Sequence, residues 1–339
     1  MAVRHVYPEN PILVRLWRGN RVESVHRGAW VVASGSGEVL HGGGSFDEPV
    51  YVRSSVKCLQ ALPLIESGAA ERFAMTTQEL ALALSSHNGE PQHTQTALGL
   101  LKRLGLGPEH LLCGASPAGD SKTRFAMRVA GERPCALHHN CSGKHAGFLA
   151  LATHLGVSPE AYLDPESASQ QMVRQAVLDM VGLEPSDLEV AIDGCSAPTF
   201  RFPLSGLARA FATFTNPETL APARAVACRQ LLAAAQAHPE LIGGSQGRLC
   251  TDLLVASEGS LFPKLGAEAV YAVGRVGHNQ ALAVKIDDGA LRGLHAVVAE
   301  LLDHLGWLPS SGLEALSTYR GRILRNAAGL DVGRMEVVL

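Results

Sequence analysis

Segments typical of β-strands lie near both ends of this chain, and segments of helical periodicity lie between them. From residue 12 to 44, β-branched and aromatic runs alternate with turn pairs such as Gly19-Asn20, which predicts antiparallel strands joined by tight turns. Strand-like runs return after residue 187, at residues 188–192, 269–273 and 282–286. This order favours a sheet built from both ends of the chain, with a helical part inserted between them.

The middle of the chain carries recognisable helix signals. Thr76-Thr77-Gln78-Glu79 has the pattern of a capping box, and Arg53-Ser54-Ser55 forms a serine-rich helix start before a kink expected at Pro63. Amphipathic spacing predicts further helices at residues 92–106, 146–155, 168–181 and 290–305. We therefore expect an α/β fold, with a mainly antiparallel sheet flanked by helices, as a single unit over residues 1–339. Residues 1–52 and 187–339 would form its α/β subdomain, and residues 53–186 a mainly helical subdomain.

Composition excludes several classes of protein. With 339 residues, 46% of them hydrophobic, the chain can bury a core without disulfides or metal. A net charge of −3 without a Lys/Arg block argues against nucleic acid as a partner. The sequence contains no apolar run long enough to predict a membrane span, and residues 1–21 contain no signal-peptide core. Seven irregularly spaced cysteines suit a reducing compartment, so we expect a cytoplasmic protein.

Lysine is rare here, with six among 29 basic residues, so a retained lysine draws attention to its chemistry. Unlike a guanidinium, a desolvated amine can become neutral and act as a base. Ser54 and Lys57 are three residues apart at a predicted helix start, a spacing that puts two Cβ atoms about 5–6 Å apart on one face. A base beside a serine activates its hydroxyl as a nucleophile. The alternative is an ordinary helix start, because this spacing is common by chance.

Two further motifs follow in order. Ser86-His87-Asn88 could be a helix end and turn, and Lys264-Leu265-Gly266 could be a solvent-exposed loop. Each motif alone is weak. Ser-x-x-Lys, Ser-x-Asn and Lys-x-Gly in this order, however, are the motif series of serine β-lactamases and penicillin-binding proteins. The expected elements agree with that series, since the first serine opens a helix and Lys264 precedes a strand.

Longer sequence segments around these motifs narrow the resemblance to a single family. The chain resembles the rhizobial-type L-asparaginases, often called asparaginase II, over nearly its whole length. The resemblance rests on five segments, which are Arg53-Ser54-Ser55-Val56-Lys57, Ser86-His87-Asn88-Gly89-Glu90, residues 139–147, Asp193-Gly194-Cys195-Ser196-Ala197-Pro198 and Lys285-Ile286-Asp287-Asp288-Gly289. It implies a fold similar to serine β-lactamases and glutaminases, hydrolysis of L-asparagine to aspartate and ammonia, and a homodimer.

The same resemblance implies a set of catalytic residues. Carried over position by position, Ser54 with Lys57 forms one Ser-Lys pair, and Ser86 with Lys264 forms the other. We expect Ser54 to be the nucleophile with Lys57 as its base. Ser86 and Lys264 would then serve as proton relay and substrate partners.

A zinc ion is also implied by the resemblance, held by Cys141, Lys144 and Cys195. Spacing alone leaves an alternative open, in which the two cysteines are small buried side chains and Lys144 caps a helix. Lysine can ligate a metal only as a neutral amine, a form that a nearby dication favours. We expect this zinc to position substrate, because a serine already supplies the nucleophile.

Asparagine makes further demands on its site. Its α-carboxylate requires a cation, and its ammonium group an acidic or carbonyl partner. Arg53 is our candidate for the carboxylate and Asp193 for the ammonium, although both could instead be structural ion-pair partners. Asn88 and His145 complete the expected substrate contacts.

Two alternative functions remain open at this point. The first is another serine amidohydrolase of the same fold, such as a glutaminase or a β-lactamase. The second is a zinc-binding scaffold protein that keeps the fold without catalysis. The retention of three motif lysines, Lys57, Lys144 and Lys264, in a lysine-poor chain argues against the scaffold.

Overall fold

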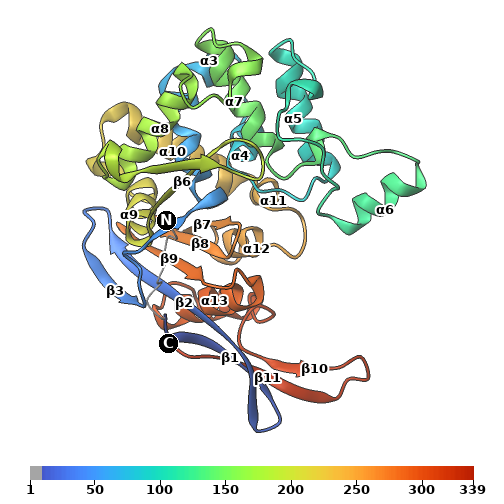
Figure 1. Cartoon of the computed structure of the whole chain (residues 1–339), viewed down its shortest axis with the longest axis vertical. Helices are drawn as coiled ribbons and strands as arrows, with labels where there is room; N and C mark the ends of the chain where they lie inside the picture. The colour runs from blue at the N-terminus through green and yellow to red at the C-terminus, as the bar shows by residue number, and fades with distance from the viewer. Residues whose placement is uncertain (1–9) are drawn as a thin grey trace, which may run out of the picture.

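The fold is built on a large antiparallel β-sheet. The computed structural model describes residues 10–339, and Figure 1 shows the sheet below a group of helices. The strand order is β10-β11-β1-β2-β9-β8-β7, and β3 pairs with β2 outside this path. The strands are β1 (Ile12–Arg18), β2 (Arg21–Ser34), β3 (Val39–Gly43), β7 (Leu261–Gly266), β8 (Val270–Arg275), β9 (Gln280–Ile286), β10 (Ile323–Arg325) and β11 (Asp331–Val337).

Both ends of the chain contribute to this sheet, as the sequence predicts. β2 from the N-terminal part pairs with β9 from the C-terminal part over seven residues. In β8 and β9, several consecutive residues are buried, so both faces of the sheet are covered at its centre, since successive side chains point to opposite faces. The helices α9 (Leu204–Thr215) and α13 (Leu291–His304) pack against these strands. The predicted α/β class, with an antiparallel sheet flanked by helices, is confirmed.

The helices of the middle region form the upper part of the molecule in Figure 1. They are α1 (Lys57–Gln60), α2 (Leu62–Glu66), α3 (Ala69–Arg72), α4 (Thr77–Ala83), α5 (Pro91–Arg103), α6 (Ser121–Val129), α7 (Ser142–His154) and α8 (Ala168–Val181). The capping box is present, because the Thr76 hydroxyl accepts from the Glu79 amide and the Glu79 carboxylate accepts from the Thr76 amide. Later helices are α10 (Pro222–Ala237), α11 (Pro239–Ile242), α12 (Leu249–Ala256) and α14 (Ser310–Ala315).

Several features differ from the sequence-based expectation, including strand β7, which contains Lys264 where a segment preceding a strand was expected. The helix expected from residue 53 is broken into a 3₁₀ helix, η1 (Arg53–Val56), followed by α1 and α2, with the break at Ala61 two residues before Pro63. The strand expected at residues 188–192 joins a second, three-stranded sheet of β4 (Pro49–Tyr51), β6 (Pro198–Pro203) and β5 (Glu189–Ile192). The hairpin of β10 and β11 was not predicted.

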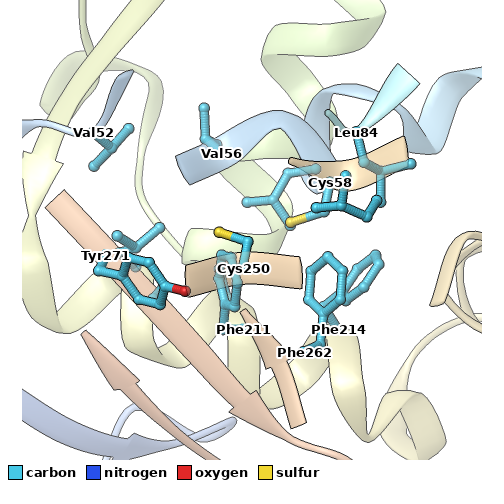
Figure 2. Packing of buried hydrophobic residues seen from close by; sticks show 14 of the residues in the cluster. Val52, Val56, Cys58, Leu84, Phe211, Phe214, Cys250, Phe262 and Tyr271 are labelled. Carbon is cyan, nitrogen blue, oxygen red and sulfur yellow. The ribbon is translucent and has the colours of Figure 1, made fainter. Parts of the chain in front are cut away.

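A buried cluster fixes the segment that carries the first motif. Val52, Val56 and Cys58 are fully buried, and Figure 2 shows them grouped with Phe211, Phe214 and Phe262. Phe262 belongs to β7 and the other two phenylalanines to α9. This packing holds η1 and α1 against the edge strand of the sheet, which is where Lys264 lies.

Two sequence-based expectations concern the N-terminus and membranes. Residues 1–9 lie outside the described residues. They belong to the 1–21 segment in which no signal-peptide core is expected, and to the expected 1–52 part of the α/β subdomain. Among residues 10–339, no helix has both the length and the apolar character needed to cross a membrane.

Candidate active site

Ser86 lies between two buried lysine amines. The Lys264 amine is 2.9 Å from Ser86 Oγ, and the Lys57 amine is 3.2 Å from the same oxygen. The three residues come from separate elements, with Lys57 beginning α1, Ser86 following α4 and Lys264 in β7. Both lysines are 1% exposed and Ser86 is 6% exposed. The fold therefore brings together one serine with two amines from distant parts of the sequence.

The two amines have different surroundings. Lys57 Nζ donates to Ser86 Oγ, to the Ser85 carbonyl and to Cys141 Sγ, three acceptors for the three N–H bonds of a protonated lysine. Within the described residues, the Lys264 amine has two hydrogen-bond partners, Ser86 Oγ and the carbonyl of its neighbour Leu265. Burial, and secondarily the proximity of Lys57, lowers the pKa of Lys264 to about 7. A large fraction of Lys264 is thus neutral near pH 7 and can accept the proton of Ser86.

Ser54 is placed differently from Ser86. It belongs to η1, is half-buried, and lines a small hollow with Gln60, Lys144 and Asp193. Among the hydrogen bonds of residues 10–339, those of Lys57 go to Ser85, Ser86 and Cys141, so the expected Ser54–Lys57 pair is not joined by one. The physical reason is that the long Lys57 side chain extends toward the segment after α4, where its donors are occupied.

The three expected zinc ligands lie close together. Cys141 immediately precedes α7, Lys144 is in the first turn of that helix, and Cys195 lies in the turn between β5 and β6. Lys144 Nζ is 3.1 Å from Cys195 Sγ, and the two thiols are hydrogen-bonded to each other. Cys141 is 3% exposed, Lys144 5% and Cys195 1%. Two sulfur donors and one nitrogen donor therefore converge in a buried position.

Of the three side chains in this cluster, Cys141 has a pKa shift that favours the form that binds a metal, whereas the pKa values of Cys195 and Lys144 are raised toward their protonated forms. The hydrogen bond from Cys195 lowers the pKa of Cys141 well below its usual range, against the effect of burial, and Lys57 and Lys144 add to the lowering. Burial acts to lower the pKa of Lys144, but Cys141 and Cys195 outweigh it and raise that pKa. Zinc binds thiolate sulfur and neutral nitrogen, so its binding here would release the protons of Cys195 and Lys144. Within the described chain no three His, Cys, Asp or Glu side chains form a metal-binding group, so zinc here would require Lys144 as a ligand.

The candidate substrate contacts divide into two groups. Arg53 forms an ion pair with Asp193, whose other oxygen accepts from the Cys195 amide at 3.3 Å. Burial raises the pKa of Asp193, but Arg53 overrides this effect and lowers it. Arg53 has a φ of 51°, a strained value for a residue with a side chain. This pair adjoins the zinc-ligand cluster, since Asp193 and Cys195 belong to one turn.

Asn88 and His145 have partners of their own. The Asn88 side-chain oxygen accepts a hydrogen bond from Arg248. His145 is fully buried in α7, and its Nδ1 lies 2.6 Å from the Tyr162 hydroxyl. Burial, and then the charge of Lys144, lowers the pKa of His145 well below its usual range. His145 is therefore a neutral residue held by Tyr162.

Arg248 is a site residue that the sequence analysis did not identify. One of its nitrogens donates to the Asn88 side chain, and another donates to the Ser86 carbonyl at 2.6 Å. It follows the segment Gly243-Gly244-Ser245-Gln246-Gly247. A Cβ at Gly244 would lie 2.4 Å from the Asn88 side chain, so only glycine allows this approach. The sequence signal for Arg248 is the density of glycines before it, and glycines alone do not indicate which chemistry a site performs.

Comparison with known proteins gives a limited set of structural likenesses. A β-lactamase from Mycobacterium bovis matches with a TM-score of 0.40 and 13% identity, over 86% of this chain and 94% of that one. Mglu in its tris and glutamate form matches with a TM-score of 0.40 and 14% identity, over 88% of this chain and 64% of that one. No function follows from likenesses this distant. None of the curated proteins matches the chain.

The family comparison is far more extensive. The family model described as L-asparaginase II matches residues 14–337, which is almost all of the described chain. The match includes the Ser86 site with its two lysines and the cluster of Cys141, Lys144 and Cys195. The family resemblance expected from the motif strings is confirmed, and the coarse activity it carries is that of an asparaginase-type amidohydrolase. The chain belongs to the L-asparaginase II family.

Proposed function

We propose that this protein is an L-asparaginase that hydrolyses the side-chain amide of L-asparagine to L-aspartate and ammonia. The observation that carries the proposal is a serine hydroxyl 2.9 Å from a buried lysine amine whose pKa is lowered to about 7. An amide needs such a base-activated nucleophile. Family membership supports asparagine as the amide.

The surroundings of the two serines favour Ser86 as the nucleophile over our sequence-based choice of Ser54. Neutral Lys264 takes the proton from Ser86 Oγ as that oxygen bonds to the amide carbon. Lys57 donates a hydrogen bond to the same oxygen, and its positive charge stabilises the negative charge that develops nearby. Ser54 would then contact the bound substrate, together with Arg53 and Asp193, without forming the covalent bond.

The reaction then proceeds in two stages. The tetrahedral intermediate collapses with cleavage of the carbon–nitrogen bond, and protonated Lys264 returns its proton to the departing nitrogen, which leaves as ammonia. Water next attacks the ester on Ser86, with Lys264 again accepting a proton. The carbon–Oγ bond breaks, protonated Lys264 returns its proton to Oγ, and aspartate is released with the serine hydroxyl restored.

Zinc is part of the proposal through Cys141, Lys144 and Cys195, which would hold it. When bound, it would supply a Lewis acid that positions a polar group of the substrate. The chain's own link between the two centres is Lys57, which contacts both Ser86 Oγ and Cys141 Sγ. A substitution of a zinc ligand would therefore also alter the surroundings of the proposed nucleophile, Ser86. A homodimer and a cytoplasmic location remain proposals from the resemblance and from the cysteines.

Intact-mass analysis of protein quenched during turnover tests the function and the nucleophile together. We expect ammonia release from asparagine and an added mass equal to the aspartyl group, mapped to the peptide that contains Ser86. Glutamine and nitrocefin should be assayed beside asparagine. Faster turnover of glutamine would favour a glutaminase, and turnover of nitrocefin alone a β-lactamase. Zinc binding without turnover of any amide would favour the scaffold alternative, and an adduct on Ser54 would contradict our choice of serine.

A further inference from the structure

Two arginines lie beside the proposed catalytic serines, and their partners differ in charge. Arg53 is paired with the Asp193 carboxylate, so its charge is already balanced. Arg248 donates to two neutral oxygens, the Ser86 carbonyl and the Asn88 side-chain amide. Among residues 10–339, no carboxylate lies within ion-pair distance of Arg248. The balanced arginine is thus the one we had expected to bind the substrate carboxylate.

The surroundings of Arg248 add to its unbalanced charge. Lys57 and Lys264 both contact Ser86 Oγ, and within the described residues neither forms an ion pair with a carboxylate. Arg248 belongs to the same group, since its positive charge also acts to lower the pKa of Lys264. Three basic side chains therefore gather around one serine, and among residues 10–339 none of them forms an ion pair with a carboxylate, although Lys57 also donates to Cys141 Sγ. A partly buried site of this kind attracts an anionic group of a ligand.

We propose that Arg248 binds the α-carboxylate of the substrate, and that the site selects primary amides carrying a carboxylate two carbon atoms away from the amide carbon. The inference rests on the proposed function, with Ser86 as the attacking group. Two hydrogen bonds use part of the guanidinium's five N–H donors, which leaves donors for a carboxylate. Arg248 is only half-buried, so a ligand can reach it.

The position of Arg248 fits the length of asparagine. Its guanidinium lies at the Ser86 carbonyl, and the proposed nucleophile is the side chain of that same residue. In asparagine, a methylene and the α-carbon separate the amide carbon from the carboxylate. A substrate whose amide is attacked by the Ser86 side chain can thus place its carboxylate at Arg248, which contacts the backbone of that same residue. Arg248 would be a specificity-determining residue, and Asn88 would hold it in place.

A pair of substrates isolates the carboxylate. 3-Aminopropanamide is asparagine without its α-carboxylate, and both should be assayed by ammonia release with the full-length, zinc-supplemented protein. For Arg248→Gln, we expect kcat/KM for asparagine to fall about 10- to 100-fold, as for loss of a charged hydrogen-bonded partner. The kcat/KM for 3-aminopropanamide, measured above the pKa of Lys264, should fall much less than that for asparagine, because this substrate has no carboxylate to lose. Arg248→Lys, which keeps the charge, should restore part of the preference for asparagine.

Controls separate this inference from a structural role. The exposed Arg128→Gln variant on α6 should leave both substrates unaffected. Circular dichroism shows whether Arg248→Gln folds, and if it does not, Arg248→Lys must show the same loss of preference in weaker form. Equal losses for both substrates would overturn the inference, since Arg248 would then only hold the Ser86 backbone. No change for either would also overturn it. Absence of wild-type turnover of asparagine is a distinct result that would overturn the proposed function, and this inference with it.

Discussion

The Lys264 amine donates to the carbonyl of Leu265 and lies 2.9 Å from Ser86 Oγ, with both side chains almost fully buried. Burial makes this contact chemically significant. An amine in water holds its proton at pH 7, whereas one excluded from water and placed beside another lysine releases it more readily. The contact therefore pairs the serine with a base that can act near neutral pH, and four predictions follow from this site.

Removing the two serines separately should distinguish their roles. We expect Ser86→Ala to lower kcat for asparagine by at least about 10³-fold, because it removes the oxygen that would form the covalent bond. Ser54→Ala should raise KM more than it lowers kcat, because Ser54 lines the hollow beside Arg53 and Asp193. Steady-state ammonia release measures both. The reverse ranking of the two variants would return Ser54 to the role of nucleophile.

Activity should depend on the protonation of Lys264. Its pKa of about 7 results first from burial and then from facing groups, which are Lys57 and Arg248 acting to lower it and Cys250 and Cys141 acting to raise it. A general base must be neutral, so kcat/KM should rise with pH through about 7 with a slope of one and level off above it. The profile should be recorded at fixed ionic strength. A pH-independent kcat/KM between pH 6 and 8 would exclude Lys264 as the base.

Loss of a sulfur ligand should release zinc. We expect Cys141→Ala and Cys195→Ala to purify with little zinc by metal analysis, whereas Cys228→Ala, a buried cysteine of α10, should keep the wild-type content. Because the proposed role of zinc is to position substrate, KM should rise more than kcat falls. Wild-type protein containing no zinc after expression in zinc-supplemented medium would contradict the metal assignment.

The sequence predicted the overall fold better than the site. Alternating and β-branched runs, together with a capping box, depend on local spacing, and the structure bears them out. The hairpin of β10 and β11 was missed because its pairing with β1, in which Val14 faces Val337, joins residues far apart in the sequence. Spacing favoured Ser54 as the partner of Lys57, yet that amine is directed by tertiary contacts to Ser86 and Cys141. Arg248 carries no motif at all, and only the fold places it beside Ser86.

The buried amine should also affect stability. The folded-state pKa of Lys264, about 7, lies below the ordinary lysine value of 10.5, so between these two pH values the unfolded chain binds more protons than the folded one. The free energy of unfolding should therefore increase with pH over that range through this group, and the burial of the charged amine should be most costly below pH 7. Lys264→Met removes the charge at similar volume. We expect it to be more stable than wild type at pH 6, by on the order of a few kcal/mol.

That advantage should shrink as the pH rises from 7 toward 10, because wild-type Lys264 is then buried in its neutral form. Urea unfolding of both proteins at pH 6 and pH 9 measures it. Lys285→Met is the matched control, since Lys285 is only partly buried and contacts the carbonyls of Glu268 and Ile286. It should show a smaller pH-dependent difference. If Lys264→Met is destabilised equally at both pH values, the amine makes contacts worth more than its desolvation costs. The assignment of a lowered pKa to Lys264 would then be wrong, and so would its proposed role as the base.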